Sequence, residues 1–112
     1  MEEYRIRVTR QAREQLREIY TYIENELVAP IAAKQILSEL KNAMLSLATM
    51  PKRIHLTPEE PWHSEGVRRD RVKNFYIYFW VNDQDKVVQI IGVIYIRRDQ
   101  TKQLEKLSKQ EN

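Results

Sequence analysis

The sequence predicts one α+β domain of order β-α-α-β-β-β-α, in which an N-terminal helical hairpin packs on a small, mainly antiparallel sheet. Two observations predict this class. The first half of the chain carries two stretches with apolar residues at helical spacing, and the second half carries three apolar, strand-like stretches separated by turn-forming residues. The 112 residues suit a single domain over positions 1–112, without linkers or internal repeats.

The first half begins with a short strand at residues 4–8, where apolar and basic residues alternate. Thr9 is a suitable N-cap for a helix whose apolar stripe continues through residues 12–27. Pro30 suits the first turn of a second amphipathic helix, and Pro51 ends it, because the residue before a proline is displaced from helical geometry. A short connection makes the two helices an antiparallel hairpin that packs on a sheet.

The second half opens with a loop at residues 52–65, which contains two prolines and has no clear period. Asp99 can cap a short final helix carrying Leu104 and Leu107, and residues 108–112 are expected to be a frayed tail. Between them the sequence predicts strands at residues 67–73, 75–81 and 87–96, the last of which is the expected central strand of the sheet.

The composition excludes several classes of protein. The chain has no cysteine, which rules out disulfides and thiolate metal ligands, and two histidines do not suffice for a histidine metal site. We therefore expect neither a metal nor another cofactor. The apolar runs are far below the roughly 20 residues that span a bilayer, and the N-terminus lacks signal-peptide features. We expect a cytoplasmic protein with no membrane partner.

Alternation divides the aromatic strand into two faces. One face is purely apolar and should meet the helical hairpin; it carries Phe75, Ile77, Phe79 and Val81. The opposite face carries Tyr76, Tyr78 and Trp80. Two interpretations of these three rings stay open. The C-terminal helix covers them, or they form a surface for a ligand or partner, since three large rings on one side of a sheet make a large apolar patch.

Basic residues flank the aromatic strand. Cations beside flat rings are the combination that holds phosphates and stacks bases. The candidate nucleic-acid-binding residues are Arg68, Arg69, Arg71, Lys73, Arg97 and Arg98. Alternation places Arg69, Arg71 and Lys73 on one face of the predicted strand at residues 67–73 and Arg68 on the other. The net charge of +3 permits an anionic partner without demanding one. In the competing interpretation these charges merely protect a sheet edge from pairing with other chains.

Several short pieces of the chain match one family in order and spacing. They are the opening strand before Thr9, YIENEL, PIAA, LATMPKR, GVR, NFYIY, and VIY followed by RD. On these pieces nearly the whole chain resembles the RelE/ParE superfamily of toxins from type II toxin–antitoxin systems. The resemblance implies a small growth-inhibiting toxin, co-expressed with an antitoxin that holds it inactive. The pieces are specific for the superfamily and not for a branch within it.

The resemblance implies one of two activities. The RelE branch cleaves mRNA in the ribosomal A site without a metal: the 2′-hydroxyl attacks the adjacent phosphate, a base and an acid move protons, and arginines stabilise the phosphorane. The ParE branch poisons DNA gyrase and is not an enzyme in that sense. We expect the ribosome-dependent endoribonuclease first and the gyrase poison as the alternative. A plain nucleic-acid-binding module without toxicity is a third hypothesis.

The RelE pattern assigns roles to individual residues. Arg69 and Arg71 match its basic pair before the aromatic strand, and Arg97 matches the arginine that ends its last strand, or Arg98 if the register slips by one. Tyr76 stands where RelE has an arginine, which is a departure from the pattern. The candidate catalytic residues are therefore Arg97, Tyr76 and Arg71, with the arginines binding phosphate and Tyr76 stacking a base or moving a proton.

Two further residues bear on the choice between branches. Gln103 stands near the position of a tyrosine in RelE's final helix, which is a second departure from that pattern. His63 is able to move protons near neutral pH, or is an exposed loop histidine with no role. The long helical hairpin resembles ParE more than RelE.

The antitoxin partner follows from the predicted surface. An inhibitor of such a small toxin must cover a basic, aromatic sheet face. We expect an acidic antitoxin, partly disordered when free, that folds over Tyr76, Tyr78 and Trp80. The expected target is the ribosome with its mRNA, or DNA gyrase.

Overall fold

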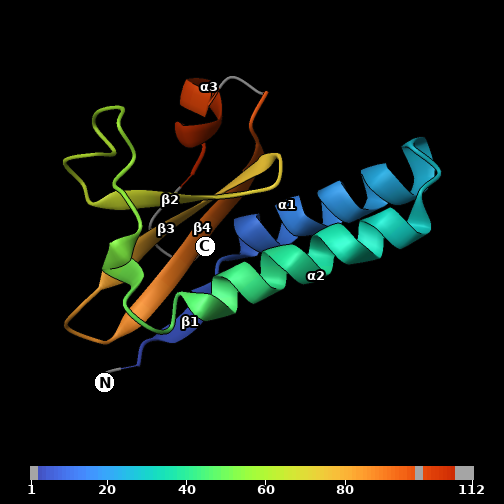
Figure 1. Cartoon of the computed structure of the whole chain (residues 1–112). Coiled ribbons are helices and arrows are strands. Elements are labelled where there is room, and N and C mark those ends of the chain that lie inside the picture. Colours follow the sequence, from blue (N-terminus) through green and yellow to red (C-terminus); the bar gives the residue numbers. More distant parts are fainter. Residues whose placement is uncertain (1–2, 98–99, 108–112) are drawn as a thin grey trace.

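The computed structural model describes residues 3–97 and 100–107, and it confirms the α+β class and the predicted element order (Figure 1). The strands are β1 (Arg5–Val8), β2 (Val67–Val72), β3 (Phe75–Asn82) and β4 (Val87–Tyr95). The helices are α1 (Arg10–Thr21), which continues into a π-helical turn (Tyr22–Glu26), α2 (Pro30–Ser46), a 3-10 turn (Pro51–Arg53) and α3 (Gln100–Leu104). The expected cap at Asp99 and the expected frayed tail lie outside the described residues.

The four strands form one sheet in the order β1-β4-β3-β2. β1 runs parallel to β4, whereas the β4–β3 and β3–β2 pairs are antiparallel. The strand that was expected to be central, β4, does lie between two others, and its residues from Val87 to Ile94 are buried. β1 and β2 form the two edges of the sheet.

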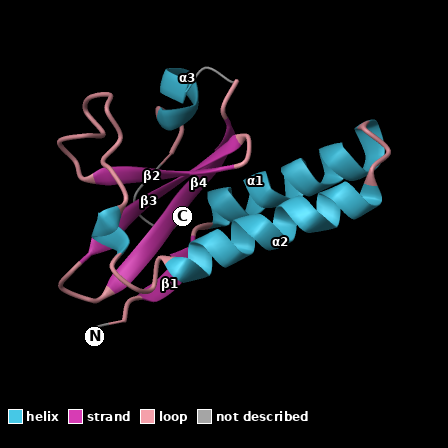
Figure 2. Ribbon diagram, in the orientation of Figure 1, coloured by secondary structure: helices cyan, strands magenta, loops and turns pink. Residues whose placement is uncertain are grey.

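The helical hairpin packs across one face of the sheet, and its far half extends beyond the strands (Figures 1 and 2). The large core between hairpin and sheet contains Ala12, Leu40, Met44, Leu47, Phe75, Ile77, Phe79, Val88, Ile90 and Val93. The predicted cap of α1 is confirmed, because the Thr9 hydroxyl oxygen accepts a hydrogen bond from the Ala12 amide at 3.2 Å. Pro30 opens α2 as expected.

α2 ends earlier than the sequence predicts. The expected stop was Pro51, but the helix ends at Ser46. The chain then turns to follow the sheet edge: the Tyr4 amide donates to the Ala48 carbonyl at 2.8 Å, and Thr49 pairs with Glu3. Pairing with the start of β1 thus replaces the last helical turn, which a local pattern does not reveal.

A second, smaller core lies on the opposite face of the sheet, beneath α3. It contains Val67, Tyr78, Ile91, Ile94 and Leu104, with Trp62, Tyr76 and Leu107 packed against it. An irregularity in the β3–β4 register beside Tyr78 and Phe79 shifts the alternation along β4, so that Ile90 and Val93, three residues apart, pack into the same large core, whereas Ile91 and Ile94 pack into the smaller one. Coverage by the C-terminal helix is therefore the correct interpretation for Tyr78, which is fully buried.

Candidate functional site

The register between β2 and β3 brings the expected basic and aromatic residues together. Arg69 lies opposite Tyr78, and Arg71 lies opposite Tyr76. Directly opposed residues in an antiparallel pair share a face, so both arginines lie on the face of the three rings. Tyr76 and Trp80 are half-buried there, whereas Tyr78 has no exposed surface. Of the three residues expected to bind the antitoxin, the fold buries Tyr78 and leaves Tyr76 and Trp80 partly exposed.

The side chain of Arg69 is bound by other residues of the protein. Its guanidinium carbon lies 4.3 Å from the centroid of the Tyr76 ring, and its Nη1 lies 3.5 Å from a carboxylate oxygen of Glu59. Arg69 also hydrogen-bonds the Tyr78 hydroxyl; burial raises the pKa of Tyr78, and this hydrogen bond opposes the rise. The side chain of Arg69 is 22% exposed. Its positive charge is therefore matched and largely enclosed.

Two of the expected phosphate-binding residues point elsewhere. Arg68 donates to the carbonyl oxygens of Ile54 at 2.7 Å and Lys52 at 3.3 Å, which ties the preceding loop to the edge strand. Lys73 has a φ of +55° and pairs with Glu39 of α2 at 3.7 Å. The prediction that Lys73 shares a face with Arg69 and Arg71 is wrong, because this left-handed turn directs Lys73 toward the hairpin.

Arg71 and Arg97 stay exposed at the same end of the sheet. The Nε of Arg71 donates to the Lys73 carbonyl at 3.3 Å, so the side chain lies along the β2–β3 turn. Arg97 follows β4, next to the point where the Ile96 amide donates to the Asn74 carbonyl at 2.9 Å. Arg71 and Arg97 thus remain available to an anion, whereas Arg98 lies outside the described residues.

The loop at residues 52–65 is anchored by His63. Its Nδ1 lies 3.0 Å from the Thr57 carbonyl oxygen. The Thr57 hydroxyl and one carboxylate oxygen of Glu59 are buried without a hydrogen-bond partner among the described atoms. This contact favours a positioning role for His63, since it holds in place the loop that carries Glu59 to Arg69.

A cavity of about 680 Å³ lies between the hairpin and the end of β4. Its apolar wall includes Ile19, Tyr22, Leu27 and Phe75, and its polar wall includes Gln15, Glu18, Asn74 and Gln103. Gln103, the residue near the RelE tyrosine position, therefore lines this cavity. The apolar surface continues onto the hairpin tip, where Val28 and Ile31 are 79% and 73% exposed.

The sequence analysis missed this cavity. The signal was the apolar run that continues from the YIENEL piece through Val28 to Ile31, which is more apolar surface than the hairpin core uses. Across residues 3–97 and 100–107, no group of three or more histidine, aspartate and glutamate side chains is placed to hold a metal ion. In the same ranges, no helix is both long and apolar enough to cross a membrane.

Comparison with known proteins places this geometry in a family. The family model of the ParE toxin of the type II toxin–antitoxin system parDE matches residues 6–100. Among solved structures, the chromosomal ParDE toxin–antitoxin system from P. aeruginosa is similar, with 22% identity, a TM-score of 0.70, and coverage of 85% of this chain and 98% of that chain. A comparison with curated protein sequences gives no significant match.

Two further structures are similar. The toxin–antitoxin complex RelBE2 from Mycobacterium tuberculosis has 20% identity and a TM-score of 0.64, with 85% of this chain and 93% of that chain covered. A mutant of the E. coli toxin RelE in the free state has 14% identity and a TM-score of 0.62, with 90% and 92% covered.

The helical hairpin on a four-stranded sheet is thus the fold of the RelE/ParE toxins. The family match spans most of the 112 residues. The chain belongs to the family of ParE toxins of type II toxin–antitoxin systems.

Proposed function

We propose that this toxin inhibits growth by poisoning DNA gyrase, in place of the mRNA cleavage that the sequence favoured, and that a cognate acidic antitoxin holds it inactive. The match to ParE toxins over residues 6–100 carries the proposal, since gyrase poisoning is the activity that the resemblance implies for the ParE branch.

The contacts that the basic residues make within the protein favour a toxin that does not cleave phosphodiesters. Cleavage requires cations that are open to the phosphate and groups that are placed to move protons. Arg69 is instead matched by Glu59 and stacked on Tyr76. Gln103 lines the cavity beside the hairpin. A phosphate would have to displace Glu59 from Arg69, which would leave a half-buried carboxylate without its cation.

The mRNA endonuclease is the second candidate function. The observation in its favour is that Arg71 lies opposite Tyr76 while Arg97 follows β4 at the same end of the sheet. In this proposal Arg71 and Arg97 bind the phosphate, and Tyr76 stacks a base or moves a proton. The reaction would depend on the ribosome and would need no metal.

The proposed antitoxin covers the aromatic face where the fold leaves it accessible. Tyr76 and Trp80 keep exposed surface on the same face of the sheet, and an acidic segment that folds on binding could lie over both. The similar structures from P. aeruginosa and M. tuberculosis are described as a toxin–antitoxin system and a toxin–antitoxin complex, which supports a partnership of this kind.

One preparation of the full chain tests both target proposals. The chain is added to a gyrase supercoiling assay on relaxed plasmid, and to an in vitro translation reaction followed by primer extension on the mRNA. Blocked supercoiling or trapped cleaved DNA, together with intact mRNA, is the expected result. Discrete new 5′ ends that appear only with ribosomes would overturn the gyrase proposal. Loss of these ends in Arg97→Ala would then establish the nuclease assignment.

A further inference from the structure

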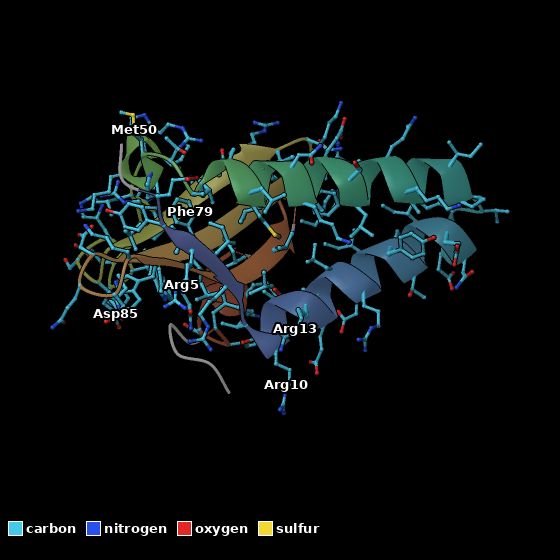
Figure 3. The ribbon with its side chains drawn as sticks, turned by 90° about the horizontal axis from the view of Figure 1, so that it is seen from below. Arg5, Arg10, Arg13, Met50, Phe79 and Asp85 are labelled. Atoms are coloured by element: carbon cyan, nitrogen blue, oxygen red, sulfur yellow. The ribbon has the colours of Figure 1, made fainter. Side chains whose placement is uncertain are left out.

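The tip of the helical hairpin, residues 22–31, gathers most of the exposed apolar surface. Six large hydrophobic residues of the described chain are exposed, and the tip carries four of them, each more than half exposed: Tyr22, Leu27, Val28 and Ile31. In Figure 3 the labelled Arg10 and Arg13 mark the sheet end of α1, and the tip lies at the opposite end of the hairpin, beyond the strands of Figure 1. Concentrated apolar surface of this kind marks an interaction site.

The backbone of the tip is fixed by its own hydrogen bonds. The Leu27 amide donates to the Tyr22 carbonyl at 3.2 Å, and the Ala29 amide donates to the Ile23 carbonyl at 3.1 Å. Between them Val28 has a φ of +48°, a conformation that a β-branched residue disfavours. Backbone strain of this kind collects where a protein meets a ligand or partner, and a preformed shape lowers the entropy cost of binding.

The cavity of about 680 Å³ adjoins the tip and shares with it Tyr22, Ile23 and Leu27. The remaining wall is largely apolar, and Glu18 is the one charged residue among those that line it in the described chain. Such a wall fits a long side chain that has an apolar stem and a cationic head. An arginine or lysine from a partner would place its stem along the apolar wall and its charge at Glu18.

The charge of the hairpin tip is opposite to that of the whole molecule. Residues 18–33 contain three glutamates and neither lysine nor arginine, in a chain whose net charge is +3. Arg17 and Lys34 flank this stretch, but neither lines the cavity. In the ranges 3–97 and 100–107, no lysine or arginine lies within ion-pair distance of Glu18. The tip and the cavity therefore present an apolar surface with a negative border.

We infer that the hairpin tip and the adjoining cavity bind the target protein of the toxin, at a surface that is apolar in its centre and carries a projecting arginine or lysine. Apolar side chains of the target cover Leu27, Val28 and Ile31, and the arginine or lysine enters the cavity toward Glu18. A basic amphipathic helix presents both features on one face.

This inference rests on the proposed function, because it assigns a surface of the toxin to the target named there. An enzyme that holds DNA carries lysines and arginines along the path of the DNA, since these residues neutralise phosphates. DNA gyrase therefore exposes the kind of basic surface that complements a negatively charged tip.

Other occupants fit this surface less well. The proposed antitoxin is acidic, and the glutamates of the tip would repel it, as they would repel a nucleic acid or an anionic membrane. A second copy joined tip to tip would bring the same glutamates together. The tip thus serves the target, whereas the aromatic face of the sheet serves the antitoxin.

The test is a fluorescence-anisotropy titration of the full chain against a labelled synthetic helix of leucine, arginine and alanine, with the leucines on one face and the arginines at its border. A matched peptide carries glutamate in place of arginine. The arginine peptide should bind about tenfold more tightly or better, because only its side chains attract Glu18. Equal binding of the two peptides, tighter binding of the glutamate peptide, or no binding of the arginine peptide would overturn the inference.

Two pairs of variants locate the binding. Leu27→Ser and Glu18→Gln should each weaken binding of the arginine peptide by about fivefold or more. The controls are Leu45→Ser, an exposed leucine at the other end of α2, and Glu14→Gln, an exposed glutamate one turn earlier in α1 that does not line the cavity. Both controls should bind as the unaltered chain does. Equal weakening by the controls, or self-association that Leu27→Ser abolishes in sedimentation, would overturn the inference.

The same variants separate this inference from the gyrase proposal. If the unaltered chain blocks supercoiling, Leu27→Ser should require about tenfold more protein for the same block, and Leu45→Ser should not. Equal potency of the two variants would refute the assignment of the tip. A chain that leaves supercoiling intact would refute the gyrase proposal, whereas the peptide titration would still decide whether the tip is a docking site.

Discussion

Arg69 changes its role when the chain folds. In the sequence it is one of several cations before an aromatic strand, whereas in the structure Glu59, Tyr76 and Tyr78 surround it. Its partners include groups that burial has separated from water, since one oxygen of Glu59 is buried without a hydrogen-bond partner. An arginine in this setting stabilises the fold more than it binds ligands.

Arg69→Ala should therefore lower the free energy of unfolding by about 1–3 kcal/mol, because it leaves the Glu59 carboxylate and the Tyr78 hydroxyl without their cation. The matched control is Arg71→Ala on the same face, where the side chain is exposed; its effect should stay within about 0.5 kcal/mol. Urea unfolding measures both. Equal effects of the two substitutions would contradict the structural role of Arg69.

Asp70 gives a prediction about pH. Burial raises the pKa of its carboxyl, and the nearby Arg53 only partly opposes this. The folded state then binds more protons than the unfolded state between the ordinary and the raised pKa, so the ionised carboxyl lowers stability as pH rises through this window. Asp70→Asn should raise Tm at neutral pH, with the difference vanishing below about pH 3. A difference that is constant with pH, measured by thermal unfolding, would contradict this cause.

The connection between α1 and α2 shows strain within one element. Val28 has a φ of +48° and is 79% exposed. A β-branched residue rarely adopts this left-handed conformation, and an exposed side chain brings little packing energy in return. The tip of the hairpin thus keeps Val28 in a backbone conformation that valine disfavours.

Val28→Gly should raise the free energy of unfolding by about 1 kcal/mol, because glycine adopts positive φ without steric penalty. Ile31→Gly is the matched control: its side chain is 73% exposed and lies in the first turns of α2, where glycine should lower stability by up to about 1 kcal/mol. Chemical unfolding of both variants decides the matter, and a loss of stability in Val28→Gly would refute the strain argument.

α3 depends on a small number of side chains for its position. Leu104 is 1% exposed, and Leu107 lies over Gly92, where an added Cβ would meet its methyl groups at 2.7 and 2.9 Å. A helix of five residues has little stability of its own. Its docking must therefore come from these contacts with the sheet.

Leu104→Ala should consequently destabilise the protein by about 2–4 kcal/mol and speed tryptic cleavage after Lys102. Glu105→Ala, which alters an exposed neighbour, should change neither quantity. Proteolysis followed by mass spectrometry provides the measurement. Unchanged cleavage in Leu104→Ala would mean that α3 is held by contacts other than those of Leu104.

Both cores of the molecule share one sheet, because β3 and β4 present alternate residues to each. This arrangement predicts one cooperative unfolding transition. Trp62 packs on the smaller core and Trp80 lies on the same face of the sheet, so intrinsic fluorescence reports that side. Far-UV circular dichroism reports mainly the hairpin on the other side. The two urea transitions should coincide; an earlier fluorescence transition would show that the smaller core opens independently.

Much of the fold could be predicted because its signals are local. The Thr9 cap, the Pro30 helix start and the alternation of the aromatic strand each depend on neighbouring residues, and all three are confirmed. The candidate site was predicted less well. The pairing of Arg69 with Glu59 and the turn of Lys73 toward Glu39 depend on loop paths, which periodicity does not encode.

The sequence by itself determined the α+β class, the two faces of the sheet and the superfamily, because apolar periodicity and motif spacing are properties of the chain alone. The tertiary structure decided which cations stay open to partners. It buried Tyr78 beneath Leu104 and left the outer edge of β1 exposed beside its arginines. These outcomes depend on the sheet order and on which distant segments meet, and long-range packing sets both.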